Sequence, residues 1–217
     1  MIKAVILDMD GTMFDTEALM LEAWECASQE LRCKSAKGIM ADCMGLRPIQ
    51  MKRLFLNKLG EDFPYEAFIQ YGKDYSARYI EKHGLPIKPG LFELLHYLKE
   101  NGYKIGVATS TAYASAMKHF ERAKVTPYFD RIICGDMLEK SKPEPDIYLM
   151  AAEALETAPQ DCMALEDSPN GVLSAYRAGM KAVMIPDLIA PDKELEKKLF
   201  ACVPTLNEVI PLLKGDK

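Results

Sequence analysis

The carboxylates Asp8 and Asp10 follow the first apolar run of the chain and are its clearest candidates for chemistry. The run, residues 4–7, has the composition of a strand that is buried on both faces. Side chains two residues apart in an extended chain point to the same face, so we expect Asp8 and Asp10 to lie together. Two like charges attract a cation, and Mg²⁺ prefers oxygen ligands. The pattern indicates a magnesium-assisted catalytic site; the alternative is an ordinary acidic turn after a strand.

Later apolar runs also end in residues that could contact a metal or an anion. Thr109 and Ser110 end one run, Glu166 and Asp167 end another, and Lys142 lies in a loop between the two. Acidic groups suit a hard metal ion, whereas hydroxyls and an ammonium group suit the oxygens of a phosphoryl group. Each residue also has an ordinary alternative role. The two hydroxyl residues could cap a helix, the lysine could be a solvated surface residue, and the two acidic residues could favour the start of a helix.

These residues converge only if the apolar runs form one sheet. The expected strands lie near residues 4–7, 105–110, 131–134, 162–165, 182–185 and, more weakly, 202–203. Because helical patterns separate the runs, we predict an α/β fold with a doubly wound parallel sheet that helices cover on both faces. Ligands bind at the carboxyl ends of the strands in such a sheet, where the polar residues would meet.

A long helical segment separates the first two strands. Residues 16–86 contain helical patterns but no convincing strand, and a helix near 90–100 already suffices to connect two parallel strands. We therefore expect a core domain of residues 1–15 and 87–217, with an all-helical cap domain inserted at 16–86. The apolar stripe expected on the helix at 64–83 consists of Phe68, Tyr71, Tyr75 and Tyr79.

The composition excludes several classes of protein. The chain has 217 residues, a net charge of −5 and 49% hydrophobic residues, so no basic surface for nucleic acid is expected. We find neither a membrane-spanning run nor a recognisable signal peptide. The six cysteines show no metal-binding spacing, and several lie within apolar runs, where a free cysteine behaves as a small buried hydrophobic residue. Free cysteines of this kind are typical of a reducing compartment. We expect a cytoplasmic monomer that binds neither nucleic acid nor a membrane.

Four motifs, in order along the chain, resemble those of the haloacid dehalogenase superfamily. They are Asp-Met-Asp-Gly-Thr at 8–12, Val-Ala-Thr-Ser at 107–110, Lys-Pro-Glu-Pro-Asp at 142–146 and Leu-Glu-Asp-Ser-Pro-Asn-Gly at 165–171. The resemblance covers essentially the whole chain and implies a Rossmann-like core. A helical insert after the first motif is similar to the subfamily of β-phosphoglucomutase and sugar-phosphate phosphatases.

The resemblance assigns distinct roles to the acidic residues. It implies that Asp8 is the nucleophile and forms an aspartyl-phosphate, while Asp10 is the general acid and then the general base. It also implies a Mg²⁺ ion bound by Asp8, the carbonyl of Asp10 and Asp167, with Glu166 as an outer or occasional direct partner.

The remaining motif residues would hold the substrate. The resemblance implies that Thr109, the Ser110 amide and Lys142 bind the phosphoryl group, while the insert closes as a lid. Within the insert, residues 45–47 resemble a segment that faces the substrate in related caps. Arg47 is therefore the candidate reader of the leaving group; a surface arginine at a helix start is the alternative.

The function we expect is Mg²⁺-dependent hydrolysis of a small phosphorylated metabolite, such as a sugar, polyol or nucleotide phosphate. A β-phosphoglucomutase-type phosphomutase is the alternative, because the same motifs serve both reactions. We favour hydrolysis because residues 168–171 and 178–187 resemble the phosphatases more closely. A non-enzymatic phosphoacceptor signalling module is a third alternative, but its acceptor follows the third strand, which here ends at Cys134.

Overall fold

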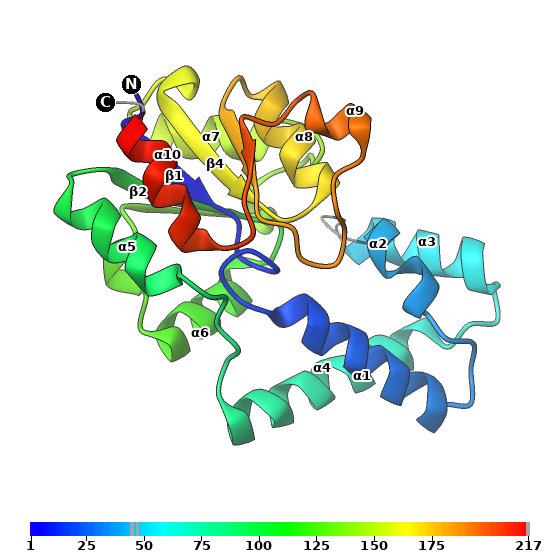
Figure 1. The fold of residues 1–217 in the computed structure, drawn as a ribbon. Coiled ribbons are helices and arrows are strands. Elements are labelled where there is room, and N and C mark those ends of the chain that lie inside the picture. The colour runs from blue at the N-terminus through cyan, green and yellow to red at the C-terminus, as the bar shows by residue number, and fades with distance from the viewer. Residues whose placement is uncertain (44–45, 47, 216–217) are drawn as a thin grey trace.

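The strands form one six-stranded parallel sheet in the order β3-β2-β1-β4-β5-β6 (Figure 1). The computed structural model describes residues 1–43, 46 and 48–215. The strands are β1 (Ala4–Leu7), β2 (Lys104–Thr109), β3 (Arg131–Cys134), β4 (Cys162–Glu166), β5 (Lys181–Met184) and β6 (Ala201–Cys202). This topology confirms the predicted doubly wound fold, including its weak sixth strand. Because β1 pairs with both β2 and β4, the residue after β1 lies at the centre of the sheet edge.

Helices cover both faces of the sheet, and β1 is buried between them. The helices of this part are α5 (Leu91–Glu100), α6 (Tyr113–Ala123), α7 (Asp146–Ala154), α8 (Pro169–Arg177), α9 (Lys193–Glu196) and α10 (Val209–Gly215). Val5 and Leu7 pack in the cluster formed with α5, α6 and α10, while Ala4 and Ile6 pack in the cluster formed with α7 and α8. Within the described ranges, no helix combines the length and apolar composition that crossing a membrane requires.

The segment between β1 and α5 is helical (Figure 1), and its buried side chains form a hydrophobic cluster of their own. Its helices are α1 (Thr16–Glu30), α2 (Met40–Cys43), α3 (Pro48–Leu59) and α4 (Tyr65–His83). The ring centroids of Trp24 and Phe55 lie 5.0 Å apart in an edge-to-face arrangement, and Phe68 packs against both rings. Aromatic packing therefore holds α1, α3 and α4 together.

The buried stripe of α4 differs from the predicted one. Phe68 is buried as expected, but the other buried positions are Tyr65, Gly72 and Ile80. The predicted Tyr75 is half-buried and donates its hydroxyl hydrogen bond to Glu22 of α1. Gly72 faces Trp24 of α1, and a Cβ at this position would lie 3.5 Å from the indole, in ordinary van der Waals contact.

Two neighbouring segments connect these helices to the sheet. The amide of Asp15 donates to the carbonyl of Pro86 at 3.0 Å, and the amide of Lys88 donates to the carbonyl of Met13 at 3.0 Å. Phe14 and Ile87 form an antiparallel bridge between these bonds. The chain thus enters and leaves the helical segment at one place, beside the end of β1.

Candidate active site

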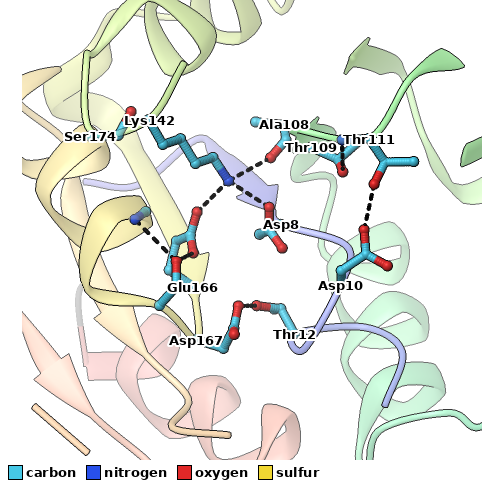
Figure 2. Close-up of polar contacts among 12 residues, drawn as sticks. Asp8, Asp10, Thr12, Ala108, Thr109, Thr111, Lys142, Glu166, Asp167 and Ser174 are labelled. Atoms are coloured by element: carbon cyan, nitrogen blue, oxygen red, sulfur yellow. Dashed lines mark hydrogen bonds and ion pairs between the residues drawn. The ribbon is translucent and has the colours of Figure 1, made fainter. Parts of the chain in front are cut away.

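The sheet brings four of the residues singled out in the sequence to one edge (Figure 2). Asp8 follows β1, Glu166 ends β4 and Asp167 comes next, while Lys142 reaches the same place from the loop that precedes α7. All four are buried. Their meeting is a direct consequence of the pairing between β1 and β4, because Leu7 and Leu165 lie in register just before the acidic residues.

Lys142 is the central cation of this cluster. Its side chain is 2% exposed, and Nζ donates to Asp8 Oδ1 at 2.5 Å, to Glu166 Oε1 at 2.5 Å and to the Ala108 carbonyl at 3.1 Å. Burial lowers the pKa of Lys142, but the two carboxylates outweigh it and hold the pKa above its usual value. The ammonium group therefore stays charged, with its three protons engaged.

Glu166 is fully buried and accepts hydrogen bonds from several donors. Besides Lys142, the Tyr148 hydroxyl donates to Oε1 at 2.6 Å and the Ser168 hydroxyl donates to Oε2 at 3.3 Å. Burial and the neighbouring carboxylates raise the pKa of Tyr148, which keeps this donor protonated. A Cβ on Gly171 would lie 1.9 Å from Glu166 Oε2, so glycine is needed for the carboxylate to fit. Tyr148 carried no signal in the sequence.

Asp167 retains an unsatisfied oxygen that could bind a metal ion. Thr12 donates to its Oδ1 at 3.0 Å, whereas Oδ2 is buried without a hydrogen-bond partner among the described residues. Carboxylate oxygens of Asp8, Glu166 and Asp167 lie within 4.8 Å of one another. Burial and the Glu166 charge raise the pKa of Asp167 to about 8, and burial raises that of Asp8 despite Lys142. These residues fit a hard divalent cation, whose charge would keep both carboxylates ionised.

Asp10 points to a different set of partners from Asp8. Thr16 donates to Asp10 Oδ1 and Thr111 donates to Oδ2, each at 2.6 Å. The two aspartates line the same cavity, but hydroxyl groups hold the Asp10 carboxylate away from Lys142. Since Thr16 is the first residue of α1, the position of Asp10 is tied to that helix. Neither threonine was singled out in the sequence.

The hydroxyl residues after β2 also line the cavity. Thr109 Oγ1 accepts a hydrogen bond from the Thr111 amide at 3.1 Å. Helix α6 begins later, with Ala112 at its N-cap, so neither Thr109 nor Ser110 caps it. Arg47, the predicted reader of the leaving group, lies outside the described residues.

A cavity of about 720 Å³ separates the acidic edge of the sheet from the helical segment. This volume is typical of small-molecule sites. Asp8, Lys142 and Asp167 line it on the sheet side. Helices α1, α3 and α4 contribute a mainly apolar wall that includes Met20, Met51, Ile69 and Lys73. A small anionic molecule could thus contact the sheet edge and the helical segment together.

Two further acidic residues approach Asp167. Glu17 lies in the first turn of α1 and Asp187 follows β5, and their carboxylate oxygens lie within 4.8 Å of Asp167 and of each other. Burial and the charges of the surrounding aspartates raise the pKa of Glu17 to about 11. Neither Glu17 nor Asp187 was predicted as a site residue from the sequence.

Comparison with known proteins agrees with this geometry. A family model described as haloacid dehalogenase-like hydrolase matches residues 5–185. The chain is 31% identical over 186 residues to the phosphorylated carbohydrates phosphatase of Thermotoga maritima, covering 83% of each chain. It is 30% identical over 187 residues to β-phosphoglucomutase of Bacillus subtilis, covering 83% and 82%. The crystal structure of β-phosphoglucomutase from Clostridium difficile shares its fold, with a TM-score of 0.79 at 24% identity over 99% and 96% of the two chains.

The contact between Gly171 and Glu166 predicts a stability loss that urea denaturation can measure. Gly171→Ala should lower the free energy of unfolding by about 1–3 kcal/mol, because the added methyl group displaces a carboxylate that three donors hold. Gly38→Ala is the matched control, since a Cβ there has no neighbour within 4 Å and should cost little. Equal unfolding free energies for the two variants would show that Glu166 moves freely.

Proposed function

This chain belongs to the haloacid dehalogenase-like hydrolase family and is a phosphatase of that family, and we propose that it hydrolyses small phosphorylated metabolites with Mg²⁺ through an aspartyl-phosphate on Asp8. The observation that carries the proposal is the buried contact of Lys142 with Asp8 at the floor of the cavity, with Asp167 beside it. That arrangement pairs a nucleophilic carboxylate with positive charge where a phosphoryl group would enter.

In the first step, we propose that a carboxylate oxygen of Asp8 attacks the phosphorus atom. A bond forms between that oxygen and phosphorus while the bond from phosphorus to the leaving oxygen breaks. Lys142 offsets the negative charge of Asp8 and of the incoming phosphoryl group, because its ammonium group is fixed 2.5 Å from Asp8 Oδ1.

Asp10 would move the protons of both steps. In its protonated form it gives a proton to the leaving alkoxide, and the resulting carboxylate then takes a proton from the attacking water. That water breaks the bond between phosphorus and Asp8, which releases inorganic phosphate and restores the nucleophile. Thr16 and Thr111 would orient the Asp10 carboxyl group through their hydroxyls.

The remaining residues would hold the metal and the phosphoryl group. Asp8, Asp167 and the backbone carbonyl of Asp10 would hold Mg²⁺, which when bound offsets charge between the nucleophile and the phosphoryl oxygens. Thr109 and the amide of Ser110 would contact the phosphoryl oxygens, since both residues line the cavity.

The helical segment would act as a cap domain, residues 16–86, over a core of residues 1–15 and 87–217. Its separate hydrophobic cluster and its paired connections beside β1 support this division. The relative from Thermotoga maritima is named for phosphorylated carbohydrates, which supports a sugar or polyol phosphate as substrate. Recognition of the leaving group by Arg47, a monomeric state and a cytoplasmic location also remain predictions.

A phosphomutase is the second candidate, supported by the similarity to β-phosphoglucomutase of Bacillus subtilis. A mutase returns the phosphoryl group to a bound sugar intermediate, whereas a phosphatase gives it to water. Phosphate release across a panel of sugar, polyol and nucleotide phosphates separates the two. We expect one inorganic phosphate for each substrate molecule consumed; isomerised sugar phosphate without free phosphate would identify a mutase.

Removal of divalent cations should abolish turnover. In excess EDTA, Lys142 is the one cation left to offset the charges of Asp8, Asp167 and the phosphoryl group among the described residues of the cluster, so phosphate release should fall to background and return with added Mg²⁺. The assay is colorimetric phosphate release. Full activity in EDTA would contradict the metal assignment.

Substitution of the two aspartates should separate nucleophile from proton donor. Asp8→Asn should inactivate the enzyme toward every phosphate ester, because no attacking carboxylate remains. Asp10→Asn should reduce kcat by about 10²–10⁴-fold for a sugar phosphate. It should reduce the phosphorylation step much less for p-nitrophenyl phosphate, whose leaving group needs little protonation. Stopped-flow release of p-nitrophenolate measures that step, and an absent burst in both variants would argue against separate roles.

A further inference from the structure

Three carboxylates beside the proposed metal site each keep one buried oxygen without a donor. These oxygens are Glu17 Oε2, Asp167 Oδ2 and Asp187 Oδ2, none of which has a hydrogen-bond partner in the part of the chain that the structure describes. The three residues come from the start of α1, the end of β4 and the segment after β5. Each offers a carboxylate oxygen within 4.8 Å of the other two. Buried acceptors without donors are costly, so their grouping points to a missing cation.

The second oxygen is anchored in two of these residues. Thr12 donates to Asp167 Oδ1 at 3.0 Å, and Lys88 Nζ lies 2.8 Å from Asp187 Oδ1. The side chains of Lys88 and Asp187 are only 14% and 10% exposed. These contacts fix the carboxylates in place while leaving one oxygen of each uncommitted, which is how a metal site is preorganised.

Glu166 differs from this group because protein donors already engage both of its oxygens. Lys142 and Tyr148 donate to Oε1, and Ser168 donates to Oε2. Lys142 in turn uses its three protons on Asp8, Glu166 and a backbone carbonyl, so it has no proton left to donate to Glu17 or Asp187.

We propose that Glu17 and Asp187 belong to the divalent-cation site with Asp8 and Asp167, and that Glu166 instead fixes Lys142. This inference rests on the proposed function, which places a hard cation between Asp8 and Asp167. Glu17 and Asp187 add oxygen ligands or acceptors for metal-bound water, both of which Mg²⁺ and Mn²⁺ prefer. They are positioning residues for the cation and take no part in phosphoryl transfer.

Direct measurement of Mn²⁺ affinity tests the proposal without an activity assay. Electron paramagnetic resonance reports free Mn²⁺ during titration of the wild-type chain and of the variants Glu17→Gln and Asp187→Asn. Each variant should bind Mn²⁺ about 10–100-fold more weakly than the wild type. The controls are Glu30→Gln and Asp62→Asn, which make the same chemical changes at exposed positions and should leave the affinity unchanged.

Thermal melting separates a role at the cation site from a purely structural one. Glu17→Gln leaves the ion pair of Lys88 and Asp187 in place and replaces an acidic group that lies beside two others with a neutral amide of similar size. Its melting temperature in EDTA should therefore equal or exceed that of the wild type, whereas its increase on addition of Mg²⁺ should be smaller. A structural role alone would lower the melting temperature in EDTA and leave the Mg²⁺-induced increase unchanged.

The two proposals fail in different ways. Wild-type Mn²⁺ affinity in both Glu17→Gln and Asp187→Asn would overturn the inference and leave the proposed function intact. A wild-type chain that binds no Mn²⁺ would overturn the metal-dependent function together with the inference.

Discussion

The burial of Lys142 among Asp8, Glu166 and the Ala108 carbonyl is the interaction on which the rest of the site depends. A buried ammonium group is tolerated only when it is paired and fully hydrogen-bonded. Its partners come from the ends of three neighbouring strands, so the order of β2, β1 and β4 in the sheet is what makes the contact possible. Two local features support this contact. The Tyr148 hydroxyl donates a hydrogen bond to Glu166, and the lack of a side chain at Gly171 leaves room for the Glu166 carboxylate.

Excess negative charge links this structure to its chemistry. Lys142 compensates Asp8 and Glu166, but the buried Asp167 and the half-buried Glu17 lie close together, and the pKa values of both are raised. A phosphoryl dianion would add to the repulsion, so the edge can accept substrate only with further positive charge. These charges therefore favour binding of a divalent cation. They also connect its binding to α1, because Glu17 and Thr16 are neighbours at the start of that helix and Thr16 donates a hydrogen bond to Asp10.

The sequence was sufficient to predict the sheet and the residues at its edge. Strand ends are visible as apolar runs that stop at polar residues, and parallel pairing places such ends together. It was not sufficient for contacts that depend on helix phase or on long-range packing. In α4 the spacing of aromatic residues predicts an apolar stripe that includes Tyr75, yet Tyr75 is only half-buried, whereas Gly72 faces Trp24. Asp187 lies close to Glu17 only in the folded chain, and no sequence pattern around either residue predicts that they are near each other.

The central claim is that Asp8 carries the phosphoryl group during turnover. Borohydride reduces an acyl phosphate to an alcohol, so denaturing quench of the working enzyme followed by borohydride would convert a phosphorylated aspartate to homoserine. Mass spectrometry of the peptides should then find homoserine at position 8 in samples quenched with substrate and Mg²⁺, and aspartate there without substrate. Homoserine at another aspartate, or unmodified Asp8 in an enzyme shown to be turning over under conditions where the phosphoenzyme accumulates, would contradict the account.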